Sequence, residues 1–164
     1  IYGISDFSLS IDLGITRKEA REYIDNYFEN YKLVKEYMDT SVASGKEKGF
    51  VETLLNRRRY IPELESKNFN IRSFGERVAM NMPIQGSAAD IIKLAMVKVY
   101  NNLKSEGFKS RLILTIHDEL IIEAHVSEVE KVKKLMKETM EKAIKLDVPL
   151  KVDVMEGDSW YDTK

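Results

Sequence analysis

The sequence has no cysteine, only three prolines and a single tryptophan among its 164 residues. The lack of cysteine excludes disulfides, thiolate zinc sites and thiol redox chemistry. No apolar run approaches the roughly 20 residues that cross a bilayer, and no charged start followed by an apolar segment and a cleavage site indicates secretion. We therefore expect a soluble cytoplasmic protein without a membrane partner.

An excess of one charge is also lacking, because 26 lysines and arginines face 27 aspartates and glutamates, which leaves a net charge of -1. This balance gives no overall attraction to nucleic acid, so such a partner requires a local basic patch. The hydrophobic content of 43% is enough for a buried core, and we expect one compact unit. The chain begins with Ile1 rather than Met, which suggests a piece cut from a longer protein.

The first part of the sequence predicts a long helix followed by a basic hairpin. Thr16 and Glu19 form a capping-box pattern, and apolar residues continue at helical spacing to about residue 44, with or without an interruption on the way. Residues 50–55 and 58–62 are predicted to be short strands joined by the two residues between them. Residues 63–73 have no clear period and predict a loop.

The middle of the sequence predicts two consecutive helical stretches. The first covers residues 74–82, and Pro83 is expected to kink or end it. The second covers residues 84–103, where apolar residues line one face, and Gly107 is its stop signal.

The last part of the sequence predicts a core hairpin, a helix and a third strand. Two apolar runs rich in β-branched residues flank the polar triplet 117–119, as in a buried hairpin. Ser127 and Glu130 repeat the capping-box pattern before a charge-rich helix. Residues 149–154 alternate apolar and polar, which predicts a strand beside the hairpin. The fold class is therefore α+β, with an antiparallel sheet packed against long helices.

Two carboxylates and an imidazole stand at the tip of the predicted core hairpin. Neighbouring strand residues point to opposite faces, so Asp118 and Glu119 are not expected to hold one ion together, and one of them is the principal ligand. A purely structural alternative is that Asp118 makes the turn and Glu119 is solvated. His117 alone is more often a structural histidine than a ligand.

A second candidate site is a row of hydrogen-bond donors. Arg77, Asn81 and Gln85 recur at intervals of four and share one face if the helix persists past Pro83. Every base pair offers acceptors in the minor groove, so such a row can test duplex geometry without reading sequence. A solvated polar face is the alternative.

A third candidate is a basic cluster, which consists of Arg57, Arg58 and Arg59 on the predicted hairpin, with Lys46 and Lys48 before it and Lys67 and Arg72 after it. DNA phosphates are its expected target, because backbone contacts of this type give affinity without sequence choice. The alternative is a charged edge that discourages strand aggregation.

These segments together resemble the C-terminal part of the bacterial members of DNA polymerase family A, over essentially the whole length. The similar segments are "YG" at 2–3, "RRRYIPEL" at 57–64, "ERVAMNMPIQGSAADIIK" at 76–93, "IHDEL" at 116–120 and the ending "GDSWYD" at 157–162. Family members often have a proline after the tyrosine of the early helix, and "NYKLVK" has none, so a break near Asn30 does not follow from the resemblance.

The resemblance implies a palm-type sheet whose hairpin presents Asp118 to catalytic Mg²⁺, with two ions in the complete enzyme. It makes Glu119 a secondary catalytic carboxylate and places His117 near the primer end. The function it implies is template-directed DNA synthesis, in which nucleotides pass from deoxynucleoside triphosphates to a primer 3′-hydroxyl by a two-metal mechanism. Its partners would be primer-template duplex DNA and a deoxynucleoside triphosphate.

The resemblance also implies DNA contacts and a division of the chain. Its expected minor-groove contacts are Arg77, Asn81 and Gln85, its backbone contacts are Arg57 and Arg58, and its contacts to the template base and incoming nucleotide are Tyr2 and Gly3. Residues 1–50 would end a helical fingers domain and residues 51–164 would belong to the palm. We expect the complete enzyme to be monomeric and associated with the nucleoid.

Two other functions remain open at this point. One is a duplex-binding module that keeps the donor row and has no catalysis. The other is a metal-dependent nuclease that uses Asp118, for which Asp153 is the only candidate second carboxylate. By the resemblance, the family's other metal-binding aspartate and its nucleotide-binding arginine and lysines precede Ile1. We therefore expect the isolated chain to extend no primer.

Overall fold

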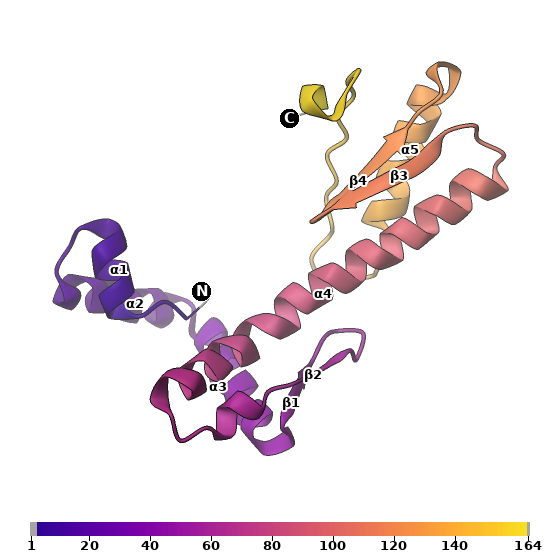
Figure 1. The fold of residues 1–164 in the computed structure, drawn as a ribbon. Helices are drawn as coiled ribbons and strands as arrows, with labels where there is room; N and C mark the ends of the chain where they lie inside the picture. The colour runs from indigo at the N-terminus through magenta and orange to yellow at the C-terminus, as the bar shows by residue number, and fades with distance from the viewer. Residues whose placement is uncertain (1–2, 164) are drawn as a thin grey trace. The chain divides into compact units, whose positions relative to one another are not determined.

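The computed structural model describes residues 3–163, which form two compact units (Figure 1). One unit extends to Ser87 and the other begins at Ala88, in place of the single unit expected from length. The helices are α1 (Asp6–Leu13), α2 (Arg17–Asn30), α3 (Lys32–Lys48), α4 (Phe69–Ser105) and α5 (Val129–Glu141), and the strands are β1 (Phe50–Glu52), β2 (Arg58–Tyr60), β3 (Arg111–Ile116) and β4 (Glu119–Glu123). This mixture of helices and small antiparallel sheets confirms the predicted α+β class.

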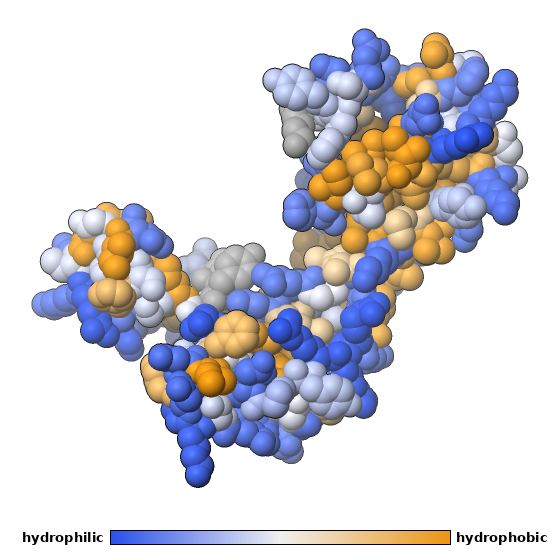
Figure 2. Space-filling view, viewed as in Figure 1, coloured by the Kyte–Doolittle hydropathy of each residue, from blue (hydrophilic) through white to orange (hydrophobic). Residues whose placement is uncertain are grey.

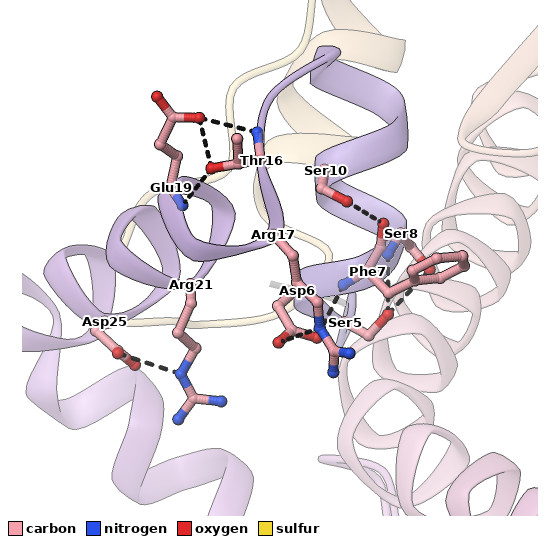
Figure 3. A network of polar contacts seen from close by, with 10 residues as sticks. All are labelled: Ser5, Asp6, Phe7, Ser8, Ser10, Thr16, Arg17, Glu19, Arg21 and Asp25. Atoms are coloured by element: carbon pink, nitrogen blue, oxygen red, sulfur yellow. Dashed lines mark hydrogen bonds and ion pairs between the residues drawn. The ribbon is translucent and has the colours of Figure 1, made fainter.

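Polar contacts join α1 to α2 and start both helices (Figure 3). The Arg17 guanidinium donates to the Asp6 carboxylate at 2.9 Å, and this hydrogen bond lowers the pKa of Asp6. The predicted capping box is confirmed, because the Thr16 hydroxyl accepts from the Glu19 N–H while the Glu19 carboxylate accepts from the Thr16 N–H. The Thr16 hydrogen bonds also lower the pKa of Glu19.

The expected long helix is interrupted once, at Tyr31. This residue lies between α2 and α3 with φ −117° and ψ 59°, outside the helical region, so the break needs no proline. Helix α3 then ends at Gly49, whose φ of 76° is a left-handed conformation that glycine adopts without steric cost.

The predicted basic hairpin forms and packs on the first part of α4, but its strands are shorter than predicted, and residues 53–57 rather than two residues connect them. Strands β1 and β2 are antiparallel, with Val51 opposite Arg59. Val51, Ile61, Leu64 and Ala79 make the buried core of this unit. One face of the hairpin is therefore fixed against the helix.

Helix α4 corrects two predictions made from the sequence. Residues 63–73 are not a loop, because a 3₁₀ turn covers Pro62–Glu65 and α4 already begins at Phe69, where the Asn68 side chain accepts from the Asn70 N–H at 2.9 Å. Pro83 does not separate two helical stretches, because α4 continues through it to Ser105. Proline removes one helical hydrogen bond, and the buried residues Ala79 and Ser87 on either side hold the helix across that position.

The second unit packs the predicted apolar face of α4 under the β3–β4 hairpin and α5. Its buried core contains Ala95, Val99, Leu103, Leu120, Val132 and Ala143. The helix ends before Gly107, as predicted, and φ is 72° at that glycine. The hairpin pairs Leu112 with Ile122 and Leu114 with Ile121, and the extra residue between them forms a bulge.

The predicted third strand does not form within residues 3–163. Residues 150–154 do alternate between half-buried and exposed, but they pair with neither edge of the hairpin. Two contacts hold this segment to α5 instead: the Val152 N–H donates to the Glu141 carboxylate at 3.3 Å, and Glu156 pairs with Lys133 at 3.0 Å. The alternating pattern therefore predicted correctly which residues are half-buried, but the segment contacts α5 and not the hairpin.

The predicted capping box of α5 is also wrong. The helix begins at Val129 without a side-chain cap. The Ser127 hydroxyl contacts His125, and the neighbouring Glu128 carboxylate accepts from the Lys109 N–H and from the backbone and hydroxyl of Ser110. Between residues 3 and 163, no helix is long and apolar enough to cross a membrane.

Candidate metal and nucleic-acid sites

The tip of the β3–β4 hairpin is a two-residue turn made by His117 and Asp118. Ile116 and Glu119 are the last paired residues on either side of it. The left-handed φ of the turn, 51°, falls on His117 and not on Asp118. The backbone therefore does not require an aspartate at position 118, which argues against a purely structural role for that side chain.

The hairpin that carries these residues has a firm apolar base. Leu120 is buried, and Leu112 and Ile122 pack against the same core. Its other face is also apolar: Figure 2 shows hydrophobic residues gathered over the hairpin, where Ile113 and Leu114 are exposed. The tip is thus a polar end on a hydrophobic element, which holds its side chains on a rigid support.

Both carboxylates of the tip are exposed and uncommitted. Within residues 3–163 the side chains of Asp118, Glu119 and His117 make no hydrogen bond or ion pair. Unpaired carboxylate oxygens on a fixed support are suitable ligands for Mg²⁺, a hard cation that takes oxygen donors. No group of three or more histidine, aspartate or glutamate side chains able to hold a metal occurs among the described residues.

The predicted donor row lines one hollow in the first unit. Because α4 is continuous past Pro83, Arg77, Asn81 and Gln85 do share a face. We call the space beside them the α4 hollow; its volume is about 600 Å³. Its lining residues are Arg59, Phe74, Arg77, Val78, Asn81, Met82, Gln85 and Gly86.

Gly3 lies beside the first member of this row. A Cβ on Gly3 would stand 3.2 Å from Arg77 Cγ and 2.9 Å from Met80 Cε, and φ is 78° at this residue. Two residues predicted for different contacts, Gly3 and Arg77, are therefore neighbours. Tyr2 lies outside the described residues.

The three arginines of the basic hairpin have different surroundings. The Arg58 guanidinium donates to Glu52 at 2.8 Å and lies 4.6 Å from the centre of the Phe50 ring, and the Glu52 contact raises the pKa of Arg58. Arg59, on the opposite face of the strand, lines the α4 hollow. The Arg57 N–H donates to the Thr53 hydroxyl at 3.1 Å.

Arg59, which the sequence placed in the basic cluster, is the one of the three hairpin arginines that lines the α4 hollow. The family resemblance implied backbone contacts for Arg57 and Arg58 and gave no separate role to Arg59. The available signal was the period of two, since Arg59 is paired with the apolar Val51 and so faces the helix that carries the donor row.

Comparison with known proteins settles the family. The sequence model of DNA polymerase family A matches residues 1–162. The chain belongs to DNA polymerase family A. It is 61% identical over all 164 residues to DNA polymerase I of Bacillus subtilis and 56% identical to that of Caldicellulosiruptor bescii. It spans 19% of the length of each of these relatives.

A solved structure agrees with this membership. The chain superimposes with a TM-score of 0.96 on the "POL domain of Pol1 from M. smegmatis complex with DNA primer-template and dNTP", with 42% sequence identity. The match covers 99% of this family A chain and 29% of the other chain. The resemblance seen in the sequence is therefore confirmed, and family A DNA polymerases are metal-dependent enzymes. The roles of individual residues remain predictions.

Proposed function

We propose that the protein to which this chain belongs carries out template-directed DNA synthesis, adding nucleotides from deoxynucleoside triphosphates to a primer 3′-hydroxyl. The observation that supports this most directly is the pair of uncommitted carboxylates, Asp118 and Glu119, on a rigid hairpin of a family A chain. The solved relative, a polymerase domain in complex with primer-template and dNTP, supports the choice of partners.

Asp118 is the proposed metal ligand of this chain. It lies in the turn itself and, like its two neighbours, is exposed, so its oxygens can meet an ion and a substrate that arrive from solvent. Glu119 begins β4 on the face opposite the buried Leu120 and would add negative charge near the ion. When bound, two Mg²⁺ ions supply activation of the attacking hydroxyl and neutralisation of the pyrophosphate that leaves. His117, beside Asp118, would contact the primer end.

The α4 hollow is the proposed contact to the minor groove of the primer-template. Arg77, Asn81 and Gln85 offer donors at one helical turn from each other, and every correct base pair presents acceptors there. A mispaired end displaces those acceptors and leaves donors unmatched. Arg57 and Arg58 would lie near the DNA backbone, and Tyr2 and Gly3 near the template base and incoming nucleotide.

The isolated chain is proposed to be inactive. Among its described residues no cluster of three or more possible ligands exists, whereas a two-metal site must clamp two ions about 4 Å apart. We propose that residues 1–50 belong to the fingers and residues 51–164 to the palm, a boundary that falls where α3 ends and β1 begins. Any primer extension by the purified 164-residue chain would contradict this proposal.

The test of the function is Asp118→Ala in the full-length polymerase. Nucleotide incorporation should fall by more than about a thousandfold, because a metal ligand contributes several kcal/mol to the transition state. Binding of primer-template, measured by fluorescence anisotropy, should stay within about twofold. The matched control is Asp153→Ala, which removes an exposed carboxylate outside the hairpin and should leave incorporation unchanged.

Each outcome of this test favours one function. Equal loss of binding and incorporation with Asp118→Ala would remove the metal role. Loss of incorporation with Asp153→Ala as well would mean that Asp153 also takes part in synthesis, whereas DNA cleavage that depends on Asp118 and Asp153, without incorporation, would favour the nuclease alternative. If Asp118→Ala changes neither incorporation nor duplex binding, the non-catalytic duplex-binding module would be the function of this segment.

A further inference from the structure

The Ser87 hydroxyl joins the basic hairpin to α4. The Leu54 N–H, just beyond β1, donates to Ser87 Oγ at 2.9 Å. Ser87 Oγ in turn donates to the Pro83 carbonyl one turn earlier in α4. Ser87 itself is buried, with 6% of its surface exposed.

The hairpin and the helix also approach closely at the preceding residue. A Cβ on Gly86 would lie 2.7 Å from Thr53 Cγ2, a distance that real Cβ contacts do not reach. Only glycine at position 86 therefore lets the hairpin lie this near α4. Thr53 is itself buried, and its hydroxyl accepts from the Arg57 N–H at 3.1 Å. The residue that touches α4 at Gly86 therefore also holds the connection between β1 and β2.

These contacts set the spacing across the α4 hollow. Arg59 lines it from the hairpin, while Asn81 and Gln85 line it from the helix. Gln85 immediately precedes Gly86, and Ser87 follows. A shift of the hairpin away from α4 would therefore move Arg59 relative to the donor row. The substitutions that cause such a shift, at Gly86 and Ser87, leave Arg59, Asn81 and Gln85 in place in the sequence.

We propose that Ser87 and Gly86 are positioning residues that fix Arg59 against the donor row and thereby set how strongly the enzyme rejects a mispaired primer end. The proposal rests on the proposed minor-groove role of the hollow. Donors held at fixed spacing fit only one arrangement of acceptors, whereas donors on a loosened frame adapt to displaced ones. Loosening should therefore lower discrimination more than it lowers extension of a matched end.

The experiment uses the full-length polymerase with the variants Ser87→Ala, Gly86→Ala and Ser87→Thr. For each, kcat and KM are measured on a matched primer end and on an end with one mismatch. With Ser87→Ala the ratio of matched to mismatched kcat/KM should fall by about fivefold, the worth of one hydrogen bond. Gly86→Ala should lower it further, because the hairpin must move. Ser87→Thr should restore it, since a threonine hydroxyl in a helix also reaches the carbonyl four residues earlier.

Ser110→Ala is the matched control for a general loss of stability. Ser110 is another buried serine, 5% exposed, whose hydroxyl donates to Glu128 and accepts from the His125 N–H far along the chain from the hollow. Its loss should lower the melting temperature and leave discrimination unchanged. If Ser87→Ala does the same and no more, Ser87 is structural only and the proposal is overturned.

Asn81→Ala and Gln85→Ala separate this proposal from the function on which it rests. If neither changes the matched-to-mismatched ratio, the minor-groove role of the hollow fails. If both lower it while Ser87→Ala and Gly86→Ala do not, the role of the hollow survives and the positioning role fails. A ratio that falls with Ser87→Ala and returns with Ser87→Thr supports both.

Discussion

The two hairpins of this chain have similar backbones but carry charges of opposite sign. A positive charge of the first hairpin is held in an ion pair, whereas the negative charges at the tip of the second are unpaired within residues 3–163. Each is a pair of antiparallel strands with one non-glycine residue of positive φ in its connection, Asn56 at 61° in the first and His117 at 51° in the second. In the first, the Arg58 guanidinium is paired with Glu52. In the second, the carboxylates of Asp118 and Glu119 pair with no described residue.

Under the proposed function, this difference matches what each charge would be needed for. Contacts to DNA depend on donors held at set positions, and a neighbouring carboxylate or a packed helix can hold them. A metal ligand instead needs free lone pairs, and a basic partner beside it would compete with the ion. A positioned cation on one hairpin and an uncommitted carboxylate on the other are therefore consistent with the DNA and metal roles proposed above.

The largest expected effect comes from removing the apolar base of the second hairpin. Leu120→Ala deletes a side chain that is 6% exposed and leaves a cavity, which should lower the free energy of unfolding by about 2–5 kcal/mol. Urea unfolding followed by circular dichroism measures it. The control is Ile113→Ala at the bulge, where the side chain is 57% exposed and the change should stay within about 0.5 kcal/mol. Equal losses would mean that the hairpin does not rest on Leu120.

The donor row of the first unit should show the next largest effect. In the full-length polymerase, Gln85→Ala should slow extension of a mispaired primer end by a different factor from a matched end, with about tenfold between the two, because a lost groove contact is worth about 1–3 kcal/mol. Single-turnover extension on both substrates measures this. Ile84→Ala, also exposed on α4 but not part of the α4 hollow, is the control. Identical factors for the two substrates would remove the geometry-sensing role.

The sequence predicted the donor row and both hairpins because each depends on the local periodicity of a helix or a strand. The interval of four placed Arg77, Asn81 and Gln85 together, and period-two runs placed both hairpins. The division into two helical stretches at Pro83 was wrong. Proline disfavours a helix locally, but packing on both sides of Pro83 keeps α4 continuous. Residues 150–154 misled for a related reason: alternation reveals burial but not which element supplies the hydrogen-bond partner.

The basic hairpin offers a smaller effect that distinguishes its two faces. Arg59→Ala in the full-length polymerase removes a cation from the proposed minor-groove contact and should make the slope of log affinity for duplex DNA against log salt less negative by about 0.9, the value for one cation withdrawn from the duplex. Arg58→Ala should change the slope less, because Glu52 already holds that guanidinium. Anisotropy titrations between about 50 and 200 mM salt measure both. A larger change for Arg58 would show that its ion pair opens on DNA.

The smallest effect is expected at Glu128, a carboxylate of the second unit that accepts several hydrogen bonds and so contrasts with the uncommitted Asp118. Hydrogen bonds from Ser110 hold the pKa of Glu128 below its ordinary 4.5. A depressed pKa in the folded state means that these contacts stabilise the fold above pH 4.5 and that the gain is lost as pH falls through the lower, folded-state pKa. Glu128→Gln should therefore lower the melting temperature at pH 7 and converge with the unmodified chain in acid. Glu130→Gln, which alters an exposed pair with Lys133, should show neither behaviour. A deficit for Glu128→Gln that persists unchanged in acid would mean that side-chain packing, and not the charge, supplies the stability.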